Sequence, residues 1–248
     1  MEKSKICYIR GGRGNTGGTT GLSACVELAL MEGRKVTVTD AARNPTFSSL
    51  YPDICTRPKS HTIPDVKEAI TRHFDKMLDD DCQGVIDIGG GQDDVLGYYK
   101  NEVDFKEFGE EMGITIVYFV TFGPNVDDYE HAQQVKERGI FGDCPVLLVQ
   151  SEGMLRMDQS PRDAFDAIEA RPDYVRWVKQ EGARPLYLPT LACLPLVRQL
   201  KLTLRDAATN QPSPDGEKIG TTNAYKVRKW LREWKESFTT FHCEEWRL

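Results

Sequence analysis

Glycine and threonine residues are concentrated in one segment near the start of the chain, Gly12–Thr20, whose sequence is GRGNTGGTT. This segment follows a short apolar stretch and opens a stretch of helical length, so we expect it to join a strand to a helix. Glycines let backbone N–H groups converge on an anion, and the N-terminus of a helix adds the positive end of its dipole. The segment therefore predicts a phosphate-binding loop.

The spacing of this segment follows the phosphate-loop pattern GxxxxGK[ST], with one departure. Gly12 and Gly17 take the two glycine positions, and Thr19 takes the position of the magnesium-binding hydroxyl. The lysine position is Gly18, which removes a positive charge that serves both phosphate binding and transition-state stabilisation. Backbone amides and magnesium remain available, so we treat nucleotide binding and hydrolysis as separate questions.

Apolar segments that alternate with amphipathic ones must position this loop. Six short segments bounded by glycine, proline or aspartate predict strands: Lys5–Arg10, Lys35–Asp40, Gly84–Ile88, Ile114–Thr121, Pro145–Gln150 and Pro185–Pro189. Seven longer segments predict helices: Thr19–Glu32, Pro64–Asp79, Asp94–Met112, Val126–Arg138, Pro161–Glu181, Pro195–Ala208 and Thr222–Phe238. The alternation predicts an α/β fold, a doubly wound and mostly parallel sheet with helices on both faces.

The composition is that of a soluble globular protein, with 40% hydrophobic and 28% charged residues. A length of 248 residues suits one core, so we expect a single domain over residues 1–248. A net charge of −6 argues against a surface devoted to nucleic acid but permits a local basic patch. No apolar stretch approaches the ~20 residues that span a bilayer, and we recognise no signal peptide, so we expect a cytoplasmic protein.

The seven cysteines and four histidines are scattered along the chain, and no pair of cysteines has CxxC spacing. Zinc sites need clustered ligands, so this pattern does not predict one. We expect the cysteines to be buried or half-buried free thiols in a reducing compartment.

The segment Gly12–Thr20 resembles the deviant Walker A loop of the ParA/MinD family of P-loop NTPases, in the SIMIBI class, whose pattern is GKGGxGKTT. Arg13 stands at the family's signature lysine and Gly18 at its second lysine. The segments Arg34–Asp40 and 84–91 follow at the family's spacing and resemble its next two motifs. The resemblance covers residues 4–91 by motif, and the remainder only by the order of strands and helices.

The resemblance implies that ATP or ADP binds here with Mg²⁺. The residues that would wrap the phosphates are Gly12, Arg13, Gly14, Asn15, Thr16, Gly17, Gly18, Thr19 and Thr20, and those near the metal are Thr19, Asp40 and Asp87. Two alternatives stay open: the aspartates could be helix caps or turn residues, and Arg13 could be a solvated loop arginine that reaches neither phosphate nor a partner subunit. Gln150 is the nearest candidate for the family's adenine-contacting asparagine.

The family's second aspartate, which orients the attacking water, is replaced here by Ala42. With the lysine also missing, we expect hydrolysis to be very slow or absent and assign no catalytic residue. The resemblance then implies a homodimer that positions or scaffolds a DNA partition, conjugative transfer or secretion complex, with any DNA contact indirect. The alternatives are a slow true ATPase, a pseudo-ATPase interaction module that binds no nucleotide, and a metabolic ligase of the same superfamily, which Gly18 disfavours.

A basic, amphipathic segment lies near the end of the chain. Its apolar stripe consists of Val227, Trp230, Leu231, Trp234 and Phe238, at i, i+3, i+4, i+7 and i+11. Such a helix can anchor to a membrane surface, but terminal helices of this fold commonly pack on the sheet. We favour packing, because ten residues follow Phe238 and the tail contains acidic residues.

Overall fold

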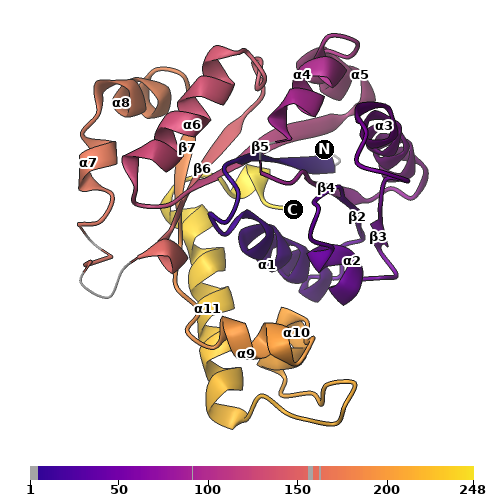
Figure 1. Cartoon of the computed structure of the whole chain (residues 1–248), viewed down its shortest axis with the longest axis vertical. Coiled ribbons are helices and arrows are strands. Elements are labelled where there is room, and N and C mark those ends of the chain that lie inside the picture. The colour runs from indigo at the N-terminus through magenta and orange to yellow at the C-terminus, as the bar shows by residue number, and fades with distance from the viewer. Residues whose placement is uncertain (1–4, 91, 156–158, 162) are drawn as a thin grey trace.

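The structure, a computed structural model, describes residues 5–90, 92–155, 159–161 and 163–248. Its centre is a sheet of seven strands, all parallel, in the order β3-β2-β4-β1-β5-β6-β7 (Figure 1). The strands are β1 (Lys5–Gly12), β2 (Val36–Asp40), β3 (Cys55–Thr56), β4 (Gln83–Asp87), β5 (Ile114–Phe122), β6 (Val146–Ser151) and β7 (Arg184–Leu188). The six predicted strands are all present, and β3 is an addition.

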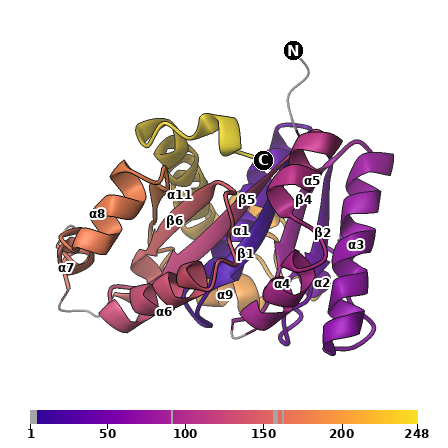
Figure 2. The same ribbon diagram turned by 90° about the horizontal axis from the view of Figure 1, so that it is seen from above.

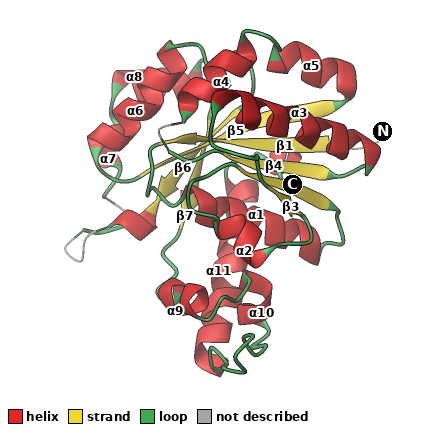
Figure 3. Ribbon diagram, turned by 45° about the vertical axis from the view of Figure 1, so that its right-hand side comes forward, coloured by secondary structure: helices red, strands yellow, loops and turns green. Residues whose placement is uncertain are grey.

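Helices cover both faces of the sheet (Figure 3). One face carries α1 (Gly18–Met31), α2 (Thr46–Leu50), α9 (Leu194–Gln199), α10 (Leu204–Ala208) and α11 (Thr221–Thr240). The other carries α3 (Ile63–Asp79), α4 (Asp93–Lys100), α5 (Phe105–Met112), α6 (Val126–Glu137), α7 (Asp166–Glu169) and α8 (Pro172–Lys179). Short 3₁₀ turns lie at Glu152–Met154 and Glu244–Trp246. The predicted doubly wound, parallel α/β fold is therefore confirmed.

The central strands show why the sheet is parallel and covered on both sides. β5 has the sequence ITIVYFVTF, and all of its residues but Thr115 are buried. Such a continuous apolar run suits a strand with helices above and below it. Alternate side chains join two separate cores, Phe119 on the side of α1 and α11, and Tyr118 on the side of α3 to α6. Figure 2 shows this layering from above, with α8 and α3 at opposite ends of the molecule.

Three of the predicted helices are each divided in two. Within the predicted helix Asp94–Met112, Asp104 starts α5 by accepting hydrogen bonds from the backbone N–H groups of Lys106 and Glu107. Thr203 starts α10 in the same way, accepting from the backbone N–H of Asp206. Polar side chains that bind backbone N–H groups end one helix and start another. The spacing of apolar residues continues across such a break, so it does not predict the break.

The predicted helix Pro161–Glu181 is also divided, and part of it lies outside the described residues. Its described portion forms α7 and α8. Pro172 lies in the first turn of α8, a position where the missing N–H of proline costs no hydrogen bond. The helix α2, which follows β2, was not predicted; it is only five residues long, too short to show a clear apolar period.

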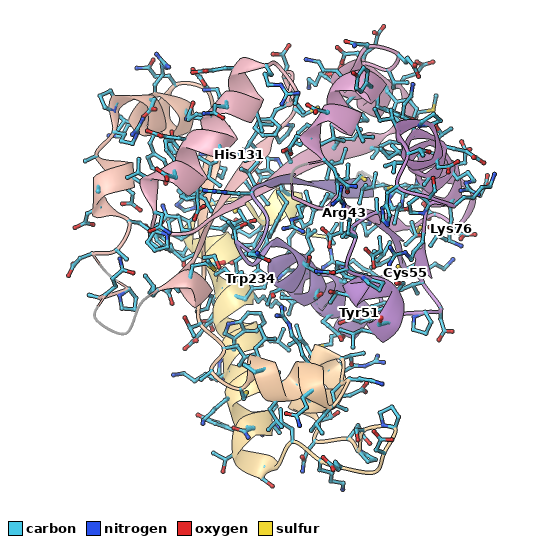
Figure 4. The ribbon with its side chains drawn as sticks, viewed as in Figure 1. Arg43, Tyr51, Cys55, Lys76, His131 and Trp234 are labelled. Atoms are coloured by element: carbon cyan, nitrogen blue, oxygen red, sulfur yellow. The ribbon has the colours of Figure 1, made fainter. Side chains whose placement is uncertain are left out.

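Helix α11 runs from an arm that it forms with α9 and α10 back to the sheet (Figure 1). All five residues of its apolar stripe are buried. Trp234, labelled in Figure 4, packs on Phe119 of β5 with ring centroids 6.2 Å apart. The interpretation that this stripe packs on the sheet is confirmed. Among the described residues, no helix is both long and apolar enough to cross a membrane.

All seven cysteines are free, six of them buried and Cys55 half-buried. Over the described part of the chain, histidine, cysteine and carboxylate side chains form no group of three or more that could hold a metal ion. The expectation of buried or half-buried thiols is therefore confirmed.

Candidate functional site

The segment Gly12–Thr20 joins β1 to α1 at the carboxyl end of the central strand. Gly17 precedes the helix in the left-handed conformation, with φ of 84°, which glycine adopts at little cost. The hydroxyl of Thr16 donates to the carbonyl oxygen of Arg13 at 2.8 Å and lies 2.8 Å from the hydroxyl of Thr121 on β5. These contacts hold the loop over the N-terminus of α1, as a phosphate-binding loop requires.

The loop rests on a buried cation that the sequence analysis did not single out. Arg10, on β1, is only 6% exposed. Its Nη1 donates to Asp87 Oδ1 at 2.9 Å and to Thr19 Oγ1 at 3.1 Å, and the Thr19 hydroxyl donates to Asp87 Oδ2 at 2.7 Å. The three side chains thus form a closed network below the loop.

The position of Arg10 explains the missing lysine. A Cβ atom built on Gly18 would lie 2.3 Å from Arg10 Nε and 2.8 Å from its Cζ. Real Cβ atoms essentially never come that close, so a side chain at position 18 would force the guanidinium to shift within its ion pair with Asp87. Arg10 and Gly18 are therefore parts of one arrangement, in which the cation comes from the strand instead of the loop.

Asp40 ends β2 and is paired in register with Asp87 of β4. Its Oδ2 accepts hydrogen bonds from the backbone N–H and hydroxyl of Ser48, at 3.1 and 3.3 Å, and lies 3.7 Å from Nη1 of Arg57. Burial, together with the nearby charge of Asp87, raises the pKa of Asp40 above its usual range. The structure thus brings Thr19 and Asp87 into direct contact and places Asp40 on the neighbouring strand, with partners of its own.

Two other predicted residues lie away from the phosphate loop's inner side. Arg13 is 55% exposed and its Nη1 is 3.3 Å from Asp128 Oδ1 on α6. Gln150 is buried at the end of β6, where its Nε2 donates to Glu169 and to the hydroxyl of Tyr174, at 2.9 and 3.0 Å. Within the described residues, the cleft beside the loop is lined by neither of them.

The loop after β4 closes tightly on the phosphate loop. A Cβ atom built on Gly90 would lie 2.1 Å from the backbone nitrogen of Gly14, so the two backbones touch where no side chain would fit. A Cβ atom built on the preceding glycine, Gly89, would lie 3.3 Å from the Cα of Ala42 in the loop after β2. Three loops at the carboxyl edge of the sheet therefore meet, which is where ligands bind in open α/β folds.

A cleft of about 1020 Å³ opens beside these loops, between α2 and the arm. The basic residues that line it are Arg10, Arg43, Arg198 and Lys201. Nη2 of Arg198, on α9, donates to the Thr20 hydroxyl at 2.6 Å, and Arg43 follows β2, above α2 in Figure 4. None of the described lining residues is acidic, although the whole chain has a net charge of −6. The cleft is therefore suited to an anion.

Part of the lining of the cleft is apolar. Leu188, which ends β7, and Pro189, which follows it, contribute to this part together with Met154 and Trp230. The indole N–H of Trp230 donates to the carbonyl oxygen of Pro189 at 2.7 Å, which fixes the ring. The cleft thus offers cations and backbone amides together with a surface on which a flat apolar group can stack.

Comparison with known proteins supports the fold. An FtsY signal recognition particle receptor from Elizabethkingia anophelis is similar at a TM-score of 0.52 and 12% identity, over 93% of this chain and 66% of that one. FlhF complexed with GMPPNP and Mg²⁺ gives 0.46 and 13%, over 94% and 76%. The Aeropyrum pernix signal recognition particle 54 kDa protein with GDP gives 0.45 and 12%, over 98% and 50%.

This chain spans only part of each of those proteins. Protein-family models and curated proteins give no match to its sequence. The fold matches the α/β fold of the FtsY receptor, with a parallel sheet and helices, which is the fold of SIMIBI-class P-loop NTPases. The predicted fold is therefore confirmed, and the resemblance to the ParA/MinD family stays a prediction.

The residues present fit a phosphate better than they fit a metal. Backbone amides of the loop and the cations of the cleft suit phosphate oxygens. A P-loop offers Mg²⁺ a hydroxyl and the carboxylate of a neighbouring strand. Here both Thr19 and Asp87 are bound to Arg10, so this network presents a guanidinium where the metal would need oxygen atoms.

Proposed function

We propose that this chain binds an adenine nucleotide in the cleft beside the loop Gly12–Thr20 and hydrolyses it very slowly or not at all. The observation that supports binding most directly is the charge of the cleft beside the N-terminus of α1, whose described lining includes four basic side chains and no acidic one. A polyphosphate neutralises such a cluster and accepts hydrogen bonds from the loop.

The cleft lacks two of the groups that nucleotide hydrolysis needs. The loop has glycine at position 18 instead of lysine, and Ala42, which lines the cleft, has no group that could orient water. Catalysis of phosphoryl transfer depends on positioning the water and stabilising charge on the γ-phosphate. Because no side chain at position 42 orients water and no loop lysine reaches the γ-phosphate, bound nucleotide would act as a structural ligand.

Adenine is favoured over guanine by the lining of the cleft. Guanine presents adjacent N–H donors that a carboxylate would pair with, and none of the described lining residues carries one. The apolar part of the lining, with Met154, Leu188 and Trp230, is compatible with stacking of a base that makes few polar contacts. The family resemblance of the loop points to ATP or ADP as well.

The biological role that we propose is that of a nucleotide-dependent scaffold. The ParA/MinD resemblance suggests a homodimer that serves a DNA partition, conjugative transfer or secretion complex. Arg13 is compatible with a contact across such a dimer, because its side chain is 55% exposed at the rim of the loop. An exposed guanidinium on this loop, held by Asp128, is accessible to a second subunit.

Calorimetric titration with ATP, ADP and GTP tests this function, alongside light scattering and a phosphate-release assay. We expect ATP and ADP to bind more tightly than GTP, dimer to form with ATP, and phosphate release to stay at background. Arg198→Ala is expected to weaken the binding of ATP at least about tenfold, because a cation of the cleft is lost. Arg72→Ala, on α3 at the other face of the sheet, serves as the matched control.

Absence of ATP and ADP binding at millimolar concentration would show that the fold is an interaction module, the alternative without nucleotide. Steady release of phosphate that Arg198→Ala abolishes would show a true ATPase. Tighter binding of GTP than of ATP would overturn the assignment of the base.

A further inference from the structure

We propose that the guanidinium of Arg10 takes the place of both the P-loop lysine and the magnesium ion, so that the loop binds phosphates without a divalent metal. This inference rests on the proposed function insofar as the phosphates belong to a nucleotide. It concerns a residue in the strand before the loop, outside the pattern by which phosphate loops are recognised.

The first argument is the position of the charge. Arg10 Nη1 lies between the Thr19 hydroxyl and the Asp87 carboxylate, 3.1 Å from one oxygen and 2.9 Å from the other. These are the two groups that a P-loop places next to Mg²⁺. A cation supplied by the chain itself thus lies where the metal would otherwise be held.

The second argument is the unused hydrogen-bonding capacity of this side chain. Arg10 is 6% exposed and lines the cleft. Its Nε is buried and has no hydrogen-bond partner among the described residues. Buried donors are almost always paired, so an unpartnered one beside an anion-binding loop points to a ligand that supplies the acceptor. Nε lies beside Gly18, in the first turn of α1, where a phosphate oxygen would complete its coordination.

The third argument is the cost of the alternative. For Mg²⁺ to be held by Thr19 and Asp87, the guanidinium would have to leave both of them. It would then be a buried charge with no partner, which is strongly unfavourable. An entering phosphate has no such cost, because Arg10 keeps Asp87 and gains a second anion through its remaining N–H groups.

Calorimetric titrations of the whole chain test the inference. ATP and inorganic tripolyphosphate are titrated separately, each in saturating magnesium chloride and in excess EDTA. We expect each affinity to differ by less than about threefold between the two conditions. In the absence of any phosphate, titration with Mn²⁺ is expected to give the same result for the wild type and for Asp87→Asn, because Asp87 holds no metal ion.

Two variants assign this behaviour to Arg10. The double variant Arg10→Gln with Asp87→Asn removes both charges together and avoids leaving one buried alone, and its fold is checked by circular dichroism and thermal unfolding. We expect it to bind tripolyphosphate at least about tenfold more weakly than the wild type, with Arg72→Gln as the control. The exchange variant Arg10→Val with Gly18→Lys restores the usual lysine, and its ATP binding is expected to become magnesium-dependent.

The outcomes separate this inference from the proposed function. ATP binding by the wild type that requires magnesium would overturn the inference and leave the proposed function intact. Metal-independent binding of tripolyphosphate without binding of any nucleotide would support the inference and overturn the nucleotide function. Failure of every phosphate compound to bind would overturn both.

Discussion

The Nε atom of Arg10 lies 2.3 Å from the point where a side chain on Gly18 would begin. The absence of lysine from the loop and the presence of arginine in the strand therefore have one physical cause, since both side chains cannot occupy that space. The loop therefore still has a positive charge beside it, although it has no lysine. Arg10 of β1 supplies this charge and is held by Asp87 and Thr19.

Restoring the lysine by itself is expected to damage the protein. Gly18→Lys forces a Cβ atom into the Arg10 guanidinium, and overpacking of a buried position costs about 1–3 kcal/mol. We expect urea unfolding to show this loss, with no gain in ATP affinity. Adding Arg10→Val should recover most of the stability. Equal stability of Gly18→Lys and the wild type would contradict the assigned position of Arg10.

The contact between the two glycine loops gives a second prediction. Gly90→Ala places a methyl group 2.1 Å from the backbone nitrogen of Gly14, so the loops must separate. We expect ATP affinity to fall about tenfold or more, because the phosphate loop loses its support. The matched control is Gly97→Ala in α4, where the nearest atom would be 4.0 Å away. There the change should leave binding unaffected and stabilise the helix by about 0.5–1 kcal/mol.

A buried histidine predicts how stability depends on pH. His73 on α3 is 2% exposed, its Nδ1 lies 3.0 Å from the Thr39 hydroxyl, and burial lowers its pKa to about 3. The unfolded chain takes up a proton near the ordinary pKa of ~6.5 while the folded chain does not. The stabilisation is therefore complete above that pH and is lost as the pH falls toward the folded value.

Urea unfolding at two pH values measures this effect. Between pH 7 and pH 5 the free energy of unfolding should fall by about 2 kcal/mol more in the wild type than in His73→Gln, which does not titrate. An equal fall in both proteins would show that His73 does not stay neutral in the folded state. The comparison cancels the contribution of the other titrating groups, which both proteins share.

The packing of α11 gives a prediction about stability at the end of the chain. Trp234 is fully buried against Phe119, so Trp234→Ala should cost about 3–5 kcal/mol in thermal or urea unfolding. Lys229→Ala, on the exposed side of the same helix, should change stability by less than about 0.5 kcal/mol. Similar effects of the two changes would mean that the stripe does not pack as described.

The order of strands and helices was accessible from sequence because it depends on local patterns. The run ITIVYFVTF predicts the strand β5, and the glycines before α1 predict a turn, in each case from neighbouring residues alone. The helix boundaries that were predicted wrongly also have local causes. Asp104 and Thr203 divide predicted helices by capping, which competes with an apolar period that continues across them.

The candidate site was only partly accessible. The loop, Thr19 and Asp87 follow from a motif, and the structure brings them together. Arg10 carried a signal that could have been used, since a charged residue in an apolar strand directly before the loop must find a partner. The resemblance also named Asp40 and Arg13. Asp40 contacts Ser48 and Arg57, and Arg13 contacts Asp128, so their roles toward a metal ion and a partner subunit stay predictions.

The sequence by itself thus determined the fold class and the place of the phosphate loop, because strand alternation and glycine spacing act over a few residues. Only the tertiary structure decided the charge of the site. Arg198 reaches Thr20 from 178 positions away along the chain, and Arg10 reaches Asp87 from 77. Electrostatic energy depends on distance in space and on burial, and neither is set by local sequence.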